Sequence, residues 1–269
     1  MSFLEKILRH RPKPITENEL RDALKHQEFV FYYQPEWDLK TNKTRGIEAL
    51  VRWESPKRGY VPPMDFIPLL EKTDLIHDFT AYLFNHTLPD LVKIHTVAPD
   101  LFLAVNLSIC QLQEKDLIQT IQNALQANNL DSKYLECELT ESQELTDDIL
   151  SNGVLDKLAE LNIPVSIDDF GTGYSSFERL KRLNIRKLKI DLSFIRTLMD
   201  DEKNKSIVSS IIKLGHDLGF PVLAEGVETT EQQEWLRDNG CDYAQGYWFS
   251  RGLPLDQLLP FLEENNKKN

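Results

Sequence analysis

Short apolar runs alternate with longer amphipathic stretches through most of this chain. The runs have strand length and are rich in β-branched residues, whereas the stretches carry apolar residues at helical spacing. Each run and its following stretch pair as 102–105 with 117–125, 135–137 with 149–161, 164–167 with 177–183, 186–188 with 207–218, and 221–224 with 232–239. Strands that alternate with helices predict a parallel sheet covered by helices.

Two architectures have this alternation, a doubly wound sheet and a closed barrel. A doubly wound sheet that binds a dinucleotide needs a glycine-rich phosphate loop after its first strand, and the chain has none there. The length of 269 residues is close to the roughly 250 residues of a typical barrel. We therefore expect an α/β fold of the (β/α)8 TIM-barrel type, with its active site at the carboxyl ends of the strands.

Polar side chains stand at the ends of the apolar runs in successive units. They are Asn106, Glu138, Asp168, Asp169, Lys189, Glu225 and Gln245, and Glu48 joins them from the apolar stretch 47–50. Each residue alone fits a structural role better, as a helix cap, a turn residue or a surface charge. Their recurrence at the same point of each unit instead predicts that they surround one cavity.

So many acidic groups around one cavity repel one another unless a positive charge lies between them. Bound divalent cations are the simplest source of that charge. Oxygen ligands without histidine or cysteine are typical of hard ions such as Mg2+ or Mn2+ rather than zinc.

Composition and charge narrow the function further. The net charge of −12 argues against binding long nucleic acid through a diffuse basic surface, but a small anionic substrate remains compatible because bound cations reverse the local field. No apolar run approaches the roughly 18 residues of a membrane helix, so no integral membrane segment is expected. Cys110, Cys137 and Cys241 lack metal-binding or redox spacing, which favours a reduced, cytoplasmic location.

The domain organisation is predicted to be simple. From Pro14 onward there is no low-complexity tract, Gly/Ser linker or block of like charge that would mark a boundary. We expect one domain at 15–269, preceded at 1–14 by an accessory helix or linker remnant. A membrane-surface or partner-binding helix is the alternative for that short segment.

Nine segments in order resemble the EAL family of cyclic di-GMP phosphodiesterases, over residues 19–254. The segments are YYQP at 32–35, EALVRW at 48–53, FIP at 66–68, VNLS at 105–108, ELTES at 138–142, DDFGTGYSS at 168–176, KID at 189–191, AEGVET at 224–229 and QGY at 245–247. A lone Glu-Ala-Leu has no weight, but nine segments in family order are highly specific.

The resemblance implies a barrel with one antiparallel strand and hydrolysis of cyclic di-GMP to linear pGpG. It implies two divalent cations, for which Mg2+ or Mn2+ is expected. Ca2+ is expected to be inhibitory, because it prefers longer and looser coordination than Mg2+. By this resemblance the ligands of one metal are Glu48, Asn106, Glu138 and Asp168, and those of the second are Asp168, Asp169 and Glu225. Lys189, Glu225 and Glu48 form the implied catalytic set, in which Lys189 holds the attacking water and Glu225 is a candidate general base.

The resemblance also implies a substrate pocket and a supporting residue. The implied substrate-binding residues are Gln34, Leu50, Arg52 and Gln245, and Glu141 is expected to support the loop at 169–176. Gly252 is a departure, because many members have proline there and glycine leaves the segment looser. A homodimer is expected from family habit alone.

Two other functions stay open at this point. A receptor that binds cyclic di-GMP without hydrolysing it would usually lack part of the ligand set, and here each matched position holds a competent residue. Without the resemblance, a barrel with acidic ligands and a lysine base also fits proton abstraction next to a carboxylate. Turnover of cyclic di-GMP against a panel of carboxylates separates these hypotheses.

Overall fold

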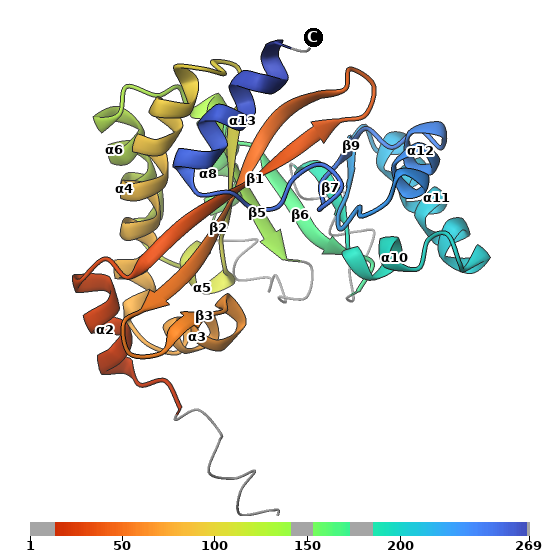
Figure 1. Ribbon diagram of the computed structural model, residues 1–269. Coiled ribbons are helices and arrows are strands. Elements are labelled where there is room, and N and C mark those ends of the chain that lie inside the picture. Colours follow the sequence, from red (N-terminus) through yellow and green to blue (C-terminus); the bar gives the residue numbers. More distant parts are fainter. Residues whose placement is uncertain (1–13, 141–152, 173–184, 268–269) are drawn as a thin grey trace, which may run out of the picture.

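Eight strands of the described chain close into a barrel (Figure 1). The computed structural model describes residues 14–140, 153–172 and 185–267. The barrel strands are β1 (Phe29–Asp38), β2 (Lys43–Ser55), β4 (Phe102–Asn106), β5 (Leu135–Thr140), β6 (Val165–Phe170), β7 (Ile185–Ile190), β8 (Val222–Ala224) and β9 (Tyr243–Ala244). They are neighbours in the order β2 to β9, and β1 pairs with both β2 and β9, which closes the ring.

One barrel strand runs against the others. β1 is antiparallel to β2 and to β9, whereas the pairs from β2–β4 through β8–β9 are parallel. The predicted TIM-type barrel with one antiparallel strand is therefore confirmed. A further strand, β3 (Gly59–Val61), extends β2 outside the ring, with Trp53 opposite Val61.

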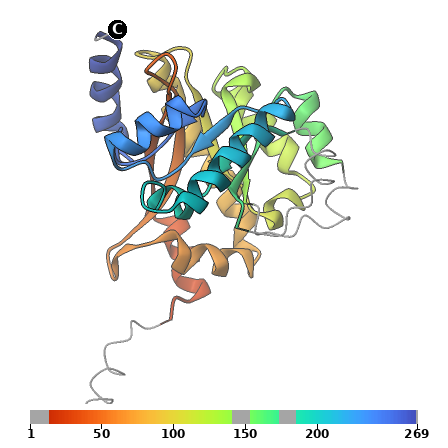
Figure 2. The ribbon, with the colours of Figure 1, turned by 90° about the vertical axis from the view of Figure 1, so that its right-hand side faces the viewer.

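Helices cover the outside of the barrel (Figures 1 and 2). They are α4 (Leu75–His95), α6 (Leu117–Ala127), α8 (Val154–Glu160), α11 (Glu202–Asp217), α12 (Thr230–Asp238) and α13 (Leu255–Lys267), and the connections hold the short α5 (Ile109–Leu112), η1 (Ser132–Tyr134) and α10 (Leu192–Arg196). Strand residues such as Cys137 and Leu139 belong to the large apolar cluster that the helices complete. None of the described helices combines the length and apolar character needed to cross a membrane.

A second, smaller apolar cluster lies where α2 (Glu17–Lys25) and α3 (Pro63–Glu71) pack beside β1 and β2. Its centre is aromatic, with the ring centroids of Phe29 and Phe66 5.1 Å apart and those of Trp53 and Phe66 5.8 Å apart. This cluster joins the first described helix to the barrel. The accessory helix or linker expected at 1–14 falls outside the described residues except for Pro14.

Helix boundaries differ from the sequence pattern for local reasons. The helix predicted at 207–218 is α11, and it begins at Glu202 because the Asp201 side chain accepts a hydrogen bond from the backbone N–H of Lys203. The helix predicted at 149–161 is described only as α8, and the one at 177–183 lies outside the described residues. The alternating pattern did not predict α4, which continues through Pro89.

Candidate active site

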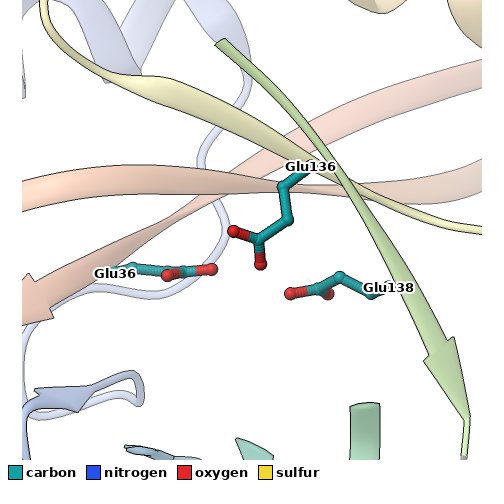
Figure 3. Close-up of side chains that lie close together, drawn as sticks. All are labelled: Glu36, Glu136 and Glu138. Atoms are coloured by element: carbon teal, nitrogen blue, oxygen red, sulfur yellow. The ribbon is translucent and has the colours of Figure 1, made fainter. Parts of the chain in front are cut away.

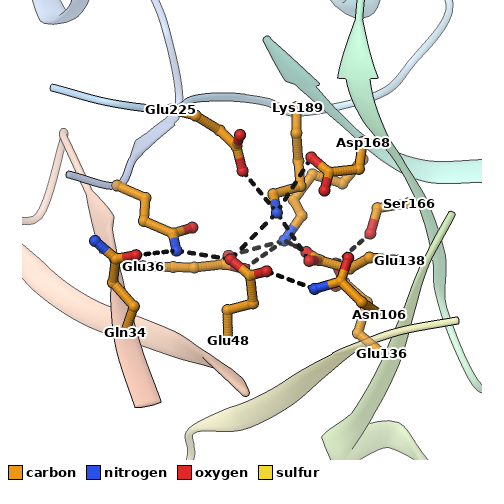
Figure 4. A network of polar contacts seen from close by, with 12 residues as sticks. Gln34, Glu36, Glu48, Asn106, Glu136, Glu138, Ser166, Asp168, Lys189 and Glu225 are labelled. Atoms are coloured by element: carbon orange, nitrogen blue, oxygen red, sulfur yellow. Dashed lines mark hydrogen bonds and ion pairs between the residues drawn. The ribbon is translucent and has the colours of Figure 1, made fainter. Parts of the chain in front are cut away.

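The polar side chains that follow the apolar runs come together at the carboxyl end of the barrel (Figure 4). Most lie in the strands rather than after them, because the strands extend beyond the apolar runs. Gln34 lies on β1, Glu48 on β2, Asn106 on β4, Glu138 on β5, Asp168 and Asp169 on β6 and Lys189 on β7, while Glu225 and Gln245 directly follow β8 and β9. We call the set Glu48, Asn106, Glu138, Asp168 and Lys189 the upper layer.

Lys189 is the cation at the centre of this arrangement. Its side chain is fully buried, and its Nζ lies 2.8 Å from Glu138 Oε2 and 2.8 Å from Glu225 Oε1. Glu48 Oε2 and Asp168 Oδ1 are each 3.4 Å from the same nitrogen. Carboxylates from three strands and from the loop after β8 thus converge on one ammonium group.

Amide side chains fix the orientation of Glu48. Asn106 Nδ2 donates a hydrogen bond of 2.6 Å to Glu48 Oε1, and Gln245 Nε2 donates one of 2.7 Å to Glu48 Oε2. Gln245 Nε2 also lies 3.1 Å from Gln34 Oε1, and Gln34 Nε2 donates to the backbone carbonyl of Ser250. These contacts connect the first strand of the barrel to the last.

Two groups of carboxylates at the carboxyl end of the barrel are close enough to hold one cation each. Glu48, Glu138 and Asp168 have oxygens within 4.8 Å of one another, and so have Asp168, Asp169 and Glu225. Asp168 belongs to both groups. The donors are oxygens alone, which fits hard divalent cations.

A distortion of β6 brings its two aspartates to the same side. Neighbouring residues of a regular strand point to opposite faces. Here the pairing of β6 with β7 shifts between Ile167 and Phe170, and Asp169 has a φ of 56°, in the left-handed region. The backbone N–H of Asp169 donates to Asp168 Oδ1 at 2.9 Å. Bulges commonly redirect a side chain beside a site, and this one allows Asp168 and Asp169 to share a cation.

A cleft of about 380 Å3 opens above the upper layer. It is lined by Gln34, Glu48, Leu50, Asn106, Asp168, Leu192, Arg196, Glu225, Gly226, Glu228, Gln245, Gly246 and Tyr247. Glu138 and Lys189 do not line it, because they lie beneath its floor. The floor is acidic, and the wall includes one cation, Arg196, among the described residues.

The family model for the EAL domain matches residues 17–252. The chain belongs to the EAL domain family. Residues 17–252 include the whole barrel and both carboxylate groups, so the resemblance based on nine short segments is confirmed.

Curated relatives of this EAL domain are longer proteins. Signaling protein YkoW of Bacillus subtilis is 41% identical over 248 residues, which are 92% of this chain and 31% of YkoW. The bifunctional diguanylate cyclase/cyclic di-GMP phosphodiesterase MucR of Pseudomonas aeruginosa is 40% identical over 90% of this chain and 36% of MucR. The chain thus spans about a third of the length of these relatives.

Solved structures of EAL domains share the fold closely. The PaMucR phosphodiesterase in complex with c-di-GMP has a TM-score of 0.85 and 40% identity, covering 90% of this chain and 98% of that one. The EAL enzyme Bd1971 in its cAMP-bound form has a TM-score of 0.86 and 32% identity, covering 96% of this chain and 71% of that one.

Arg52 does not line the main cleft of this EAL domain. Its Nη1 donates to the backbone carbonyl of Val51 at 2.8 Å, and its guanidinium carbon lies 5.9 Å from the Tyr32 ring centroid. It lines a neighbouring cavity of about 210 Å3, which shares Leu50 and Asn106 with the cleft. A substrate that contacts Arg52 therefore has to extend past Leu50.

The expectations for Glu141 and for Gly252 can be compared with the structure to different extents. Glu141 and half of the loop that it is expected to support, residues 173–176, lie outside the described residues. Gly252 lies beside the cleft wall, where an added Cβ would be 3.4 Å from Leu50 Cδ1. A larger residue at 252 would contact that wall.

Besides Gly226 and Gly246, four cleft residues had no role in the sequence analysis. Leu192 and Arg196 come from α10, Glu228 belongs to the AEGVET segment, and Tyr247 follows β9. Tyr247 is 59% exposed, and Arg251 stacks on its ring at 4.5 Å. Glu228 and Tyr247 lie within matched segments and Leu192 directly follows one, but the segments alone assigned them no role.

Burial and like charges perturb the acidic groups. Burial raises the pKa of Glu225 to about 8, with Lys189 opposing and Asp168 adding to the shift. Burial, followed by repulsion from Asp168, raises the pKa of Asp169 to about 6. Burial lowers the pKa of Lys189, but the carboxylates around it raise the pKa more, so the lysine stays charged. One ammonium among five carboxylates leaves a surplus of negative charge that divalent cations would offset.

Proposed function

We propose that this EAL domain is a metal-dependent phosphodiesterase that hydrolyses cyclic di-GMP to linear pGpG. The observation that carries the proposal is the pair of carboxylate groups that share Asp168 at the floor of the cleft. The 40% identity to a phosphodiesterase solved with c-di-GMP supports the choice of substrate.

The chain supplies ligands for two cations. Glu48, Asn106, Glu138 and Asp168 would hold one, and Asp168, Asp169 and Glu225 would hold the other. When bound, two such cations lower the pKa of a shared water and stabilise the attacking and leaving oxygens of an in-line displacement. Mg2+ or Mn2+ fits this set better than zinc, because histidine and cysteine are absent from it.

The remaining groups orient water and substrate. Lys189 would hold the attacking water through its buried ammonium, and Glu225 would accept the proton that the water loses. The new bond joins the water oxygen to phosphorus, and the bond to the ribose oxygen breaks as that oxygen takes up a proton. Gln245 would help to orient the attacking water indirectly, because its side chain donates a hydrogen bond to Glu48.

Substrate would bind across the cleft and the adjoining cavity. Gln34 and Leu50 line the cleft, and Arg52 would meet a phosphate from the neighbouring cavity. Membership of the EAL family counts against the alternative of proton abstraction next to a carboxylate. The cytoplasmic location and the homodimer stay predictions from sequence.

The decisive experiment is incubation of the purified protein with cyclic di-GMP and Mg2+, followed by chromatography of the nucleotides. Accumulation of pGpG is the expected result. Calorimetric binding of cyclic di-GMP without product, with either Mg2+ or Mn2+ present, would contradict hydrolysis and favour a receptor.

A further inference from the structure

A second polar layer lies inside the barrel, one step further from the mouth than the upper layer. Side chains two residues apart on a strand share a face, so β5 presents Glu136 below Glu138 and β7 presents Lys187 below Lys189. We call Glu36, Glu136, Ser166 and Lys187 the lower layer. Figure 4 shows Glu36, Glu136 and Ser166 in the same polar network as the upper layer.

Lys187 holds this layer together. Its Nζ lies 2.8 Å from each carboxylate oxygen of Glu36 and 2.7 Å from Glu136 Oε1. Ser166 Oγ donates a hydrogen bond of 2.6 Å to the same oxygen of Glu136. All four residues are buried, with Lys187 only 3% exposed.

Stability alone does not account for this layer. The interior of such barrels is usually filled by branched apolar side chains. A buried ion pair or triad is often no more stable than apolar residues of the same volume, because both charges lose their water. The lower layer therefore has to be explained by what adjoins it.

Glu138 is the connection between the two layers. The carboxylates of Glu36, Glu136 and Glu138 lie close together (Figure 3), with oxygens within 4.8 Å of one another. Lys187 Nζ lies among them, 3.6 Å from Glu138 Oε1. Among the described residues that buried oxygen has no hydrogen-bond partner, whereas Oε2 contacts Lys189.

We propose that Lys187 is a positioning residue for the metal site and acts through Glu138. Its ammonium separates the carboxylates of Glu136 and Glu138, which share one face of β5 and repel each other without it. With Lys187 in place, Glu138 keeps one oxygen directed to the upper layer. This inference rests on the proposed function only in taking Glu138 as a metal ligand.

The test is a pair of variants assayed for Mn2+ affinity in the absence of nucleotide. Lys187→Met with Glu36→Met removes one charge of each sign, so the net charge of the interior is unchanged. We expect this double variant to bind Mn2+ about 10–100-fold more weakly, as when other outer partners of metal ligands are lost. Adding Glu136→Gln should restore most of the affinity, because it removes the repulsion on Glu138.

The rescue separates positioning from two simpler roles. A purely electrostatic role predicts still weaker binding on adding Glu136→Gln, because a negative charge is lost. A purely structural role predicts a lower melting temperature with unchanged Mn2+ affinity. The matched control is Arg58→Met, which removes the remote ion pair with Glu19 and should leave Mn2+ affinity unchanged. Mn2+ binding by the double variant equal to that of the unaltered protein, or a triple variant weaker than the double, overturns the inference.

Ser166→Ala carries the test if the double variant does not fold. It removes one hydrogen bond to Glu136 and should weaken Mn2+ binding roughly 3–10-fold. An unchanged affinity in Ser166→Ala would then overturn the inference. Failure of the unaltered protein to bind Mn2+ at all would contradict the proposed function, and this inference with it.

Discussion

The upper and lower layers inside the barrel are built on the same strands but have different roles. Each layer has a lysine from β7 and a glutamate from β5, and the corresponding residues of the two layers are two positions apart along each strand. In the lower layer the ammonium contacts two carboxylates at 2.7–2.8 Å, and the centroid of the Phe102 ring lies 5.2 Å from it. With Asp169 and Glu225, the upper layer places five carboxylates beside one lysine, against the two of the lower layer beside Lys187, and it borders the cleft. Surplus charge next to an open cleft, rather than buried charge itself, distinguishes the candidate site.

Removing divalent cations should have the largest effect, and only on the upper layer. Chelation should abolish turnover, Mg2+ or Mn2+ should restore it, and Ca2+ should not. Ca2+ prefers oxygens at about 2.3–2.6 Å with loose coordination, whereas Mg2+ requires near-octahedral geometry at about 2.0–2.1 Å. Calorimetry in Ca2+ should show cyclic di-GMP binding without product, and excess Mn2+ should then yield pGpG. Equal turnover in Ca2+ would refute the water-activation argument.

Isosteric changes in each layer should separate their roles. Asp168→Asn removes the carboxylate that both groups share, and should lower kcat/KM by more than about 1,000-fold, roughly 4 kcal/mol of transition-state stabilisation. Glu36→Gln in the lower layer should lower kcat/KM by on the order of tenfold. Steady-state kinetics on variants with native circular dichroism give both values. A folded Asp168→Asn protein with near-normal turnover would remove the two-metal assignment.

Removing the Phe102 ring, which packs beside the lower layer, should affect stability more than chemistry. The Phe102 ring fills the space above Gly46, where even a Cβ would overlap it. Phe102→Ala should lower the free energy of unfolding by about 2–3 kcal/mol, less than a fully buried phenylalanine costs because this ring is partly exposed. Urea unfolding measures the loss, and kcat should change little because Lys187 keeps its carboxylate partners. A collapse of kcat at unchanged stability would place Phe102 in the chemistry instead.

A change remote from both layers should have the smallest effect. Hydrogen bonding from Arg58 lowers the pKa of Glu19 from 4.5 to about 2. A depressed carboxylate pKa adds stability above pH 4.5 that is lost as the pH falls toward 2. Glu19→Gln should therefore flatten the acid dependence of unfolding in that window, by under about 1 kcal/mol because the pair is partly exposed. Unfolding curves at pH 5, 4 and 3 test this, and an unchanged slope would mean that the pair adds nothing.

Local sequence patterns were enough to predict the architecture and the family. Alternating apolar runs and amphipathic stretches predicted the barrel, because each strand buried on both faces and each helix with one apolar face leave a strong local pattern. The nine ordered segments predicted the EAL family. The acidic residues of the upper layer were also predicted as a group, because each stands near a strand end and such ends converge in any barrel of this kind. Their roles as ligands and catalysts stay predictions.

Which charges meet inside the barrel could not be predicted from local patterns and depends on the folded chain. Lys187 and Glu36 are 151 residues apart, and the pattern around Lys187 is equally typical of a surface lysine, because strand alternation does not say which face is interior. The approach of Asp169 to Asp168 depends on a bulge that leaves no signal in the sequence. The place of Arg52 beside the cleft depends on side-chain packing against Tyr32. Such contacts are set by closing the ring through β1, a long-range event that no local pattern records.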